Sequence, residues 1–157
     1  VISTSGTATE GTDYAAISDI TISAGSTTGS SSLTPTDDSI YELDETAIID
    51  ISSVTGGAAE SGTQQETVTI TNDDSAPTVT LALSSSAQDE DDNTAVTVTA
   101  TLSNPTYQAV TVTLSASGTA TASTDYSLSS STITVSAGSS TGTVTITNTD
   151  DSTYEGD

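Results

Sequence analysis

The sequence predicts an all-β protein built from short antiparallel strands. Val, Ile and Thr alternate through much of the chain, which is the period of a half-buried strand. Gly, Asn and Ser separate these runs as turn residues do, and no segment has a helical period. The aromatic residues are five Tyr, and Phe, Trp, Met and Cys are absent. We therefore expect a thin core without disulfides, in which Tyr14 and Tyr126 fill apolar space.

The clearest boundary is at 72–77, where two acids and a proline end one run of strands and the next begins. After it, alternation predicts strands at Thr78–Leu83, Ala95–Leu102, Ala109–Leu114, Thr132–Val135 and Thr143–Thr147. In Ala95–Leu102, Val96, Val98, Ala100 and Leu102 share one face. Two further strands are read before the boundary, at Ala47–Ser52 and Glu66–Thr71. Together these predict a seven-stranded, two-sheet antiparallel sandwich of the immunoglobulin-like kind.

The chain repeats itself with a period of 112 to 113 residues, about the size of a domain. GTATEGTDY at Gly6–Tyr14 recurs as GTATASTDY at Gly118–Tyr126, and DDSIYE at Asp37–Glu42 recurs as DDSTYE at Asp150–Glu155. TISAGSTTG and TVSAGSSTG form a third such pair. We therefore interpret residues 1–75 as the C-terminal part of one repeat and residues 76–157 as the N-terminal part of the next. A longer tandem array is expected.

All charged side chains are acidic: the chain has 22 Asp and Glu and no Lys, Arg or His. This excludes nucleic acid and anionic membranes as partners, because both need cationic side chains. No apolar run approaches the ~18 residues of a membrane span, so no membrane insertion is expected. Without His, Cys or Lys the usual bases and nucleophiles are missing, and glycoside chemistry by carboxylate pairs needs a cleft with stacking aromatics. We expect no enzymatic activity.

The acids collect at predicted loops and strand ends. Carboxylates that gather in a chain without basic residues repel one another unless water disperses them or a cation bridges them. Ligands that are all oxygen favour a hard cation, and Ca²⁺ accepts the irregular geometry of loops better than Mg²⁺ does. A solvated acidic surface is the alternative, and for the run 89–92 it is as good an interpretation as ligation.

These motifs resemble the Calx-beta domain family, a calcium-binding sandwich of sodium–calcium exchangers, an integrin and many microbial surface proteins. The resemblance rests on GTATEGTDY, TISAG, TDDSIYELDE and TVTITNDD. It implies calcium ligands in the first copy at Asp13, Asp37, Asp38, Glu42, Glu45, Asp73 and Asp74, with the backbone carbonyl of Ile40. In the second copy it implies Asp125, Asp150, Asp151 and Glu155, together with Glu90 or a neighbour within Asp89–Asp92.

The function expected from this resemblance is a calcium-binding structural repeat of an extracellular filament, stalk or adhesin. Because Asp73 and Asp74 stand just before Pro77, calcium is expected to stiffen the junction between repeats. The alternative is a regulatory calcium-sensor module of a membrane transporter or receptor, but the resemblance between the two copies favours the stalk.

The expected partners are neighbouring repeats of the same chain, or identical subunits that exchange strands in a filament. The 44 residues shared by the two copies disfavour the exchange, because both subunits would bring the same strands. Cell-surface or matrix ligands are further candidates. An extracellular location is expected, because modules of this kind bind calcium at about 10⁻⁴–10⁻³ M.

Overall fold

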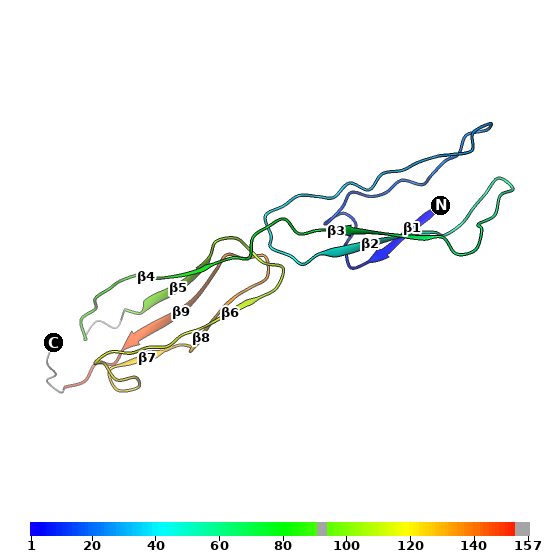
Figure 1. Ribbon diagram of the computed structural model, residues 1–157. Helices are drawn as coiled ribbons and strands as arrows, with labels where there is room; N and C mark the ends of the chain where they lie inside the picture. The colour runs from blue at the N-terminus through cyan, green and yellow to red at the C-terminus, as the bar shows by residue number, and fades with distance from the viewer. Residues whose placement is uncertain (91–93, 153–157) are drawn as a thin grey trace. The chain divides into compact units, whose positions relative to one another are not determined.

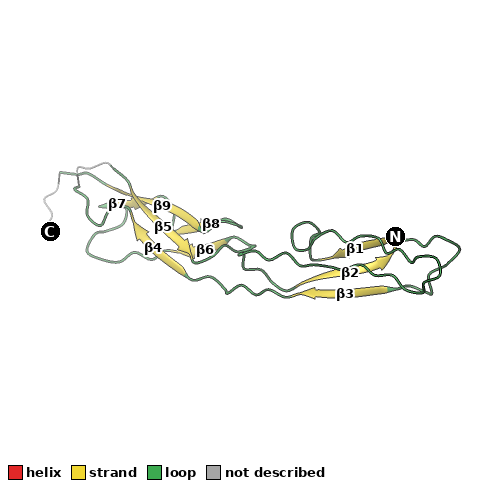
Figure 2. Ribbon diagram, turned by 90° about the horizontal axis from the view of Figure 1, so that it is seen from above, coloured by secondary structure: helices red, strands yellow, loops and turns green. Residues whose placement is uncertain are grey.

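The computed structural model describes residues 1–90 and 94–152, and these form two units, Val1–Asp73 and Asp74–Asp157. Every regular element in the described residues is a β-strand, and all strand pairs are antiparallel (Figures 1 and 2). The prediction of an all-β, antiparallel protein is therefore confirmed. The described part of the chain contains no helix that could span a membrane.

Unit 1 contains one sheet of three strands in the order β1-β2-β3. These strands are β1 (Ile2–Gly6), β2 (Glu45–Ile51) and β3 (Gln65–Ile70). Gly6, which pairs with Ala47, has a φ of +114°, and a Cβ atom at this position would clash with the carbonyl oxygen of Thr46. Only glycine allows β1 to end this close to β2. The core of the unit is small: Ala8, Tyr14 and Ala47 are buried, with Leu33 and Ile70 packed against them.

Unit 2 contains two sheets, one of four strands in the order β4-β5-β9-β7 and one of two strands, β6 and β8. The strands are β4 (Val79–Leu83), β5 (Val96–Leu102), β6 (Val110–Thr113), β7 (Tyr126–Leu128), β8 (Thr132–Val135) and β9 (Thr141–Asn148). Residues of both sheets meet in one core cluster, which is the packing expected of a sandwich. This cluster consists of Val98, Ala100, Ile133 and Val144.

All seven predicted strands are present, and their ends differ from the prediction by at most two residues. The predicted alternation of β5 is confirmed, because its four apolar residues are buried and the Thr residues between them are not. β8 and β9 follow one another across the predicted turn at Gly138, which has a φ of +72°, but they belong to different sheets. Neither unit contains seven strands among its described residues, so the seven-stranded repeat stays a prediction.

Strands β1 and β7 were not predicted, and only one of the two tyrosines expected in the core is fully buried. β1 has the sequence ISTSG, with a single large apolar residue, and β7 is three residues long, so neither carries a measurable alternation. Tyr14 is 1% exposed, which confirms its predicted place in the core. Tyr126 is only half-buried in unit 2.

Candidate metal centre

Three carboxylates converge in unit 1. Oxygen atoms of Asp13, Glu42 and Glu45 lie within 4.8 Å of one another, and all three residues are half-buried. They come from three segments: the turn after β1, the loop before β2, and the first residue of β2. The fold therefore brings together acids that are up to 32 positions apart in the sequence.

Asp13 is held by the turn that its own motif forms. Its backbone amide donates to the Thr9 carbonyl oxygen at 2.9 Å, and its Oδ2 atom accepts the Thr9 amide at 2.5 Å. Its carbonyl oxygen accepts the Thr36 amide at 2.9 Å. Gly11 supplies the positive φ, +88°, that the turn needs. The Asp13 carboxylate is therefore anchored before any ligand arrives.

Glu45 lies on the inward face of β2. It pairs directly with Ile70 and is two residues from the fully buried Ala47, so strand alternation turns its side chain towards the core. Burial raises the pKa of the Glu45 carboxyl above its ordinary value of 4.5, and the hydrogen bond to the Asp13 side chain and the negative charges of Asp13 and Glu42 raise it further. The surroundings of Glu45 in the folded chain thus disfavour its negative charge.

Glu42 is positioned by Asn72, a residue that the sequence analysis did not single out. The Asn72 side-chain Oδ1 atom accepts a hydrogen bond from the backbone amide of Glu42 at 3.2 Å. The backbone amide of Asn72 donates to Oδ1 of Asp44 at 3.0 Å. These bonds tie the loop before β2 to the end of β3. The signal in the sequence was an amide side chain at a strand end, directly before two acids.

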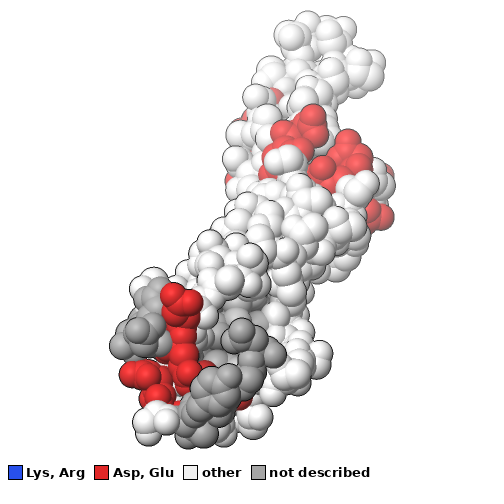
Figure 3. All heavy atoms as spheres, turned by 90° about the vertical axis from the view of Figure 1, so that its left-hand side faces the viewer, with Lys and Arg blue, Asp and Glu red and all other residues white. Residues whose placement is uncertain are grey.

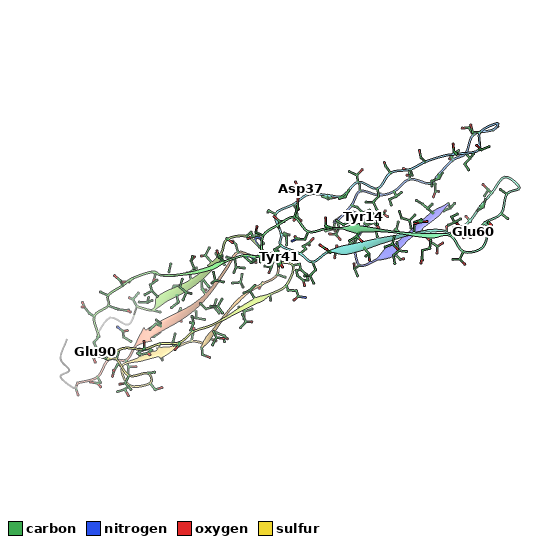
Figure 4. The ribbon with its side chains drawn as sticks, viewed as in Figure 1. Tyr14, Asp37, Tyr41, Glu60 and Glu90 are labelled. Atoms are coloured by element: carbon green, nitrogen blue, oxygen red, sulfur yellow. The ribbon has the colours of Figure 1, made fainter. Side chains whose placement is uncertain are left out.

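The other carboxylates predicted for the first site do not join this cluster. Asp37 is exposed on the loop before β2 (Figure 4). Asp38 accepts the Ile40 amide at 2.7 Å through Oδ1, which closes a local turn. Asp73 is exposed, and Asp74 belongs to unit 2. Calcium ligation by Asp37, Asp38, Ile40, Asp73 and Asp74 stays a prediction.

Unit 2 repeats the Asp13 turn at Asp125, and its described residues do not form a second cluster of three acids. The Asp125 amide donates to Thr121 O at 2.9 Å, its Oδ2 accepts the Thr121 amide at 2.5 Å, and its carbonyl oxygen accepts the Thr149 amide at 2.9 Å. Asp125 is half-buried, whereas Glu90, Asp150 and Asp151 are exposed. Glu155, the counterpart of Glu42, lies outside the described residues. Within the described ranges of unit 2, no three acids converge.

The chemistry of the unit 1 cluster fits a hard divalent cation. The donors are carboxylate oxygens, three of them close together, and the chain has no Lys, Arg or His to neutralise them. Figure 3 shows acidic atoms gathered in patches, and no basic side chain. A cation with two positive charges and a preference for oxygen ligands would offset the repulsion among the three carboxylates.

Comparison with known proteins assigns the family. The sequence model of the Calx-beta domain matches the chain twice, at residues 1–74 and 72–157. Searches of curated proteins and of solved structures found no significant match. Calx-beta domains are calcium-binding β-sandwich modules with structural or regulatory roles and no catalytic one. Because the two matches together cover the whole sequence, the chain belongs to the Calx-beta domain family, and the two successive matches are consistent with tandem repeats of it.

Proposed function

We propose that this chain binds Ca²⁺ through Asp13, Glu42 and Glu45, as a structural repeat of an extracellular filament, stalk or adhesin. The observation that carries the proposal is the convergence of three half-buried carboxylates within 4.8 Å in a chain without a basic side chain. Three negative charges at this distance repel one another strongly in a partly dehydrated place. Ca²⁺ relieves this repulsion and needs several oxygens at once.

The supporting geometry is that two of the ligands are held independently of any ion. The turn at Thr9 holds Asp13, and β2 holds Glu45 at its first residue. A binding site whose ligands are already placed loses less conformational entropy when the ion binds. The ion would tie the turn after β1 to β2, and binding to the folded state alone would stabilise unit 1 by mass action.

We further propose that calcium acts between successive repeats of a tandem array. In this proposal a complete repeat is a seven-stranded sandwich, and the acids Asp73 and Asp74, which directly precede the restart at Pro77, let calcium stiffen the junction between repeats. Neighbouring repeats or identical subunits are the proposed partners, together with cell-surface or matrix ligands. The proposed location is extracellular, where calcium is near 10⁻³ M, as modules with affinities of about 10⁻⁴–10⁻³ M require.

A calcium titration of thermal unfolding tests the proposal. The chain is unfolded in EDTA and at rising calcium, at constant ionic strength, with magnesium as the control ion. We expect a calcium-specific rise in the unfolding temperature that is half-complete at about 10⁻⁴–10⁻³ M. A regulatory sensor would respond at about 10⁻⁷–10⁻⁵ M instead.

Two variants with the same change of charge locate the ion. Glu45→Gln should raise the calcium concentration at half-effect by at least about tenfold, because it removes a charged ligand. Glu66→Gln, on the exposed part of β3, should leave it unchanged. Equal responses of the two variants, or an equal effect of magnesium on the parent chain, would contradict the proposal.

A further inference from the structure

Residues 71–78 join the last strand of unit 1 to the first strand of unit 2. β3 ends at Ile70 and β4 begins at Val79, and no residue between them belongs to a strand. A joining segment without secondary structure behaves as a flexible tether unless other residues hold it. The hydrogen bonds at its two ends show how much of this segment is held.

Asn72 fixes the N-terminal end of the segment to unit 1. Its backbone amide donates to Oδ1 of Asp44 at 3.0 Å, and its side-chain Oδ1 accepts the backbone amide of Glu42 at 3.2 Å. Both partners belong to the loop before β2, and Asn72 is half-buried. The chain is therefore fixed to unit 1 as far as Asn72.

Asn104 fixes the C-terminal end of the segment to unit 2. It is half-buried in the loop after β5, and its Nδ2 atom donates to the carbonyl oxygen of Ser75 at 3.1 Å. Its Oδ1 atom accepts the Ser103 hydroxyl at 3.0 Å, and that hydroxyl accepts the Thr78 amide at 3.0 Å. The Ser103 amide donates to the Thr78 carbonyl oxygen at 3.0 Å. These bonds continue the contact between β4 and β5 back to Ser75.

The two residues between Ser75 and Thr78 are restricted by covalent geometry. Pro77 has a fixed φ, and the residue before a proline, here Ala76, is confined to extended conformations. Pro77 is also half-buried. Residues 75–78 are therefore bonded to unit 2 at both ends and stiff in the middle.

We infer that Asn72 and Asn104 are anchoring residues that confine any bending between the units to Asp73 and Asp74. Asn72 is bonded within unit 1 and Ser75 within unit 2, so only the two acids lie between the anchored positions. The inference goes beyond the proposed function and does not depend on calcium, because every bond that it uses is made by the chain itself.

The expected size of the effect follows from the length of the free segment. Loss of the Asn104 bond would leave residues 73–77 between Asn72 and the bonds of Thr78. The reach of a flexible segment grows as the square root of its length, so the range of distances between the units should widen about 1.6-fold.

Distances between two spin labels test the inference. The chain has no Cys, so labels attach only where cysteines are introduced. Thr67→Cys on β3 and Thr111→Cys on β6 place one label at an exposed position of each unit. Pulsed electron paramagnetic resonance of the full chain in EDTA gives the distribution of distances. Asn104→Ala should widen it about 1.6-fold, and an unchanged width would overturn the inference.

Asn148→Ala is the matched control. Asn148 is also half-buried, and its Nδ2 atom also donates to a backbone carbonyl oxygen at 3.1 Å, that of Asp89. This variant should keep the width of the parent chain, and a widening equal to that of Asn104→Ala would overturn the inference. A second label pair within unit 2, at Thr111 and Ser127, should not respond to Asn104→Ala. Widening of that pair would mean that unit 2 itself had loosened, which would also overturn the inference.

Two further variants cover the other end and a failure to fold. Asn72→Ala should widen the distribution by less, because the backbone amide can still donate to Asp44; an unchanged width would overturn the role of Asn72. Ser103→Ala removes the hydroxyl that bonds both Asn104 and Thr78, and it should widen the distribution even if Asn104→Ala does not fold.

An insertion of two glycines between Asp73 and Asp74 locates the bending. It should widen the distribution about 1.4-fold, and no widening would show that the units do not bend there and overturn the inference. A calcium effect on unfolding without an effect of Asn104→Ala would leave the proposed function standing. The reverse result would leave the anchoring residues standing without the calcium site.

Discussion

The two copies of the GTAT-x-x-TDY motif form the same turn in different surroundings. In both, the Asp amide lies 2.9 Å from the carbonyl oxygen four residues before it, and Oδ2 lies 2.5 Å from the amide of that residue. Yet Tyr14 is 1% exposed and Tyr126 is half-buried. The turn is thus encoded locally. In unit 1 the buried cluster around Tyr14 includes Ala47 of β2, and the carboxylates that converge with Asp13 include Glu45 of β2.

In a second pair of equivalent segments, the copy in unit 2 is the more buried one. Ile133 and Val135 of β8 are fully buried in unit 2, whereas their counterparts Ile20 and Ile22 are 43% and 56% exposed in unit 1. The chain reversal itself is conserved between the copies. A Cβ atom on Gly29 would lie 2.5 Å from the Thr21 carbonyl oxygen, and one on Gly142 would lie 2.6 Å from that of Thr134. Among the described residues, unit 1 thus exposes the counterparts of two apolar side chains that unit 2 buries.

The largest effect is expected when the tyrosines of the two turns are truncated. Tyr14→Ala should lower the free energy of unfolding of unit 1 by about 4 kcal/mol, because it empties a buried aromatic site. Tyr126→Ala should lower that of unit 2 by about half as much, since its ring still contacts water. Hydrogen exchange followed by mass spectrometry reports on each unit separately. Equal losses would show that Tyr126 is as well covered in solution as Tyr14.

Alanine substitutions of Gly6, which ends β1, and of its counterpart Gly118 should destabilise their units by different amounts. Gly6→Ala should cost about 3 kcal/mol, because the added Cβ atom clashes with the Thr46 carbonyl oxygen and the residue must keep a φ of +114°. Gly118 has a φ of +147° but nothing within 4 Å of a Cβ atom, so Gly118→Ala should cost about 1 kcal/mol. Hydrogen exchange followed by mass spectrometry compares the stability losses of the two variants. A cost at Gly118 that matches the cost at Gly6 would mean that residues 114–118 are paired in solution.

The same contrast explains which features were predictable from the sequence. β5 was predicted because four buried residues alternate with Thr, and this pattern is contained in the strand itself. β1 was missed because ISTSG becomes a strand only through its pairing with β2. Within the acidic motif, Glu42 and Glu45 converge with Asp13, but Asp37 and Asp38 do not. That distinction depends on Asn72 and on the face of β2, neither of which is visible in the spacing of the acids.

A smaller and reciprocal effect is expected inside the turn. Position 11 is Gly with a φ of +88°, and its counterpart is Ser123 with a φ of +70°, a conformation that L side chains rarely adopt. Ser123→Gly should stabilise unit 2 by about 1 kcal/mol, and Gly11→Ser should destabilise unit 1 by about as much. Urea unfolding of each variant, monitored by hydrogen exchange in the unit that carries the substitution, measures both changes in stability. Effects of the same sign would show that contacts of the Ser123 side chain offset the cost of its positive φ.

The smallest effect, the pH dependence of unit 1, sharpens the comparison at the carboxylates. Because the pKa of Glu45 is raised in the folded chain, the folded state binds more protons than the unfolded state at pH values between 4.5 and the raised pKa. In EDTA the contribution of Glu45 to stability is therefore complete below 4.5 and is lost as the pH rises through the raised value.

Urea unfolding from about pH 4 to about pH 7 should show this decline in the parent chain and a smaller one in Glu45→Gln. Calcium should reverse the sign, because the ion binds the deprotonated carboxylates and competes with the proton. If calcium leaves the slope unchanged, Glu45 does not contact the ion. In that case the raised pKa results only from burial and the neighbouring acids, and the two units differ in packing alone.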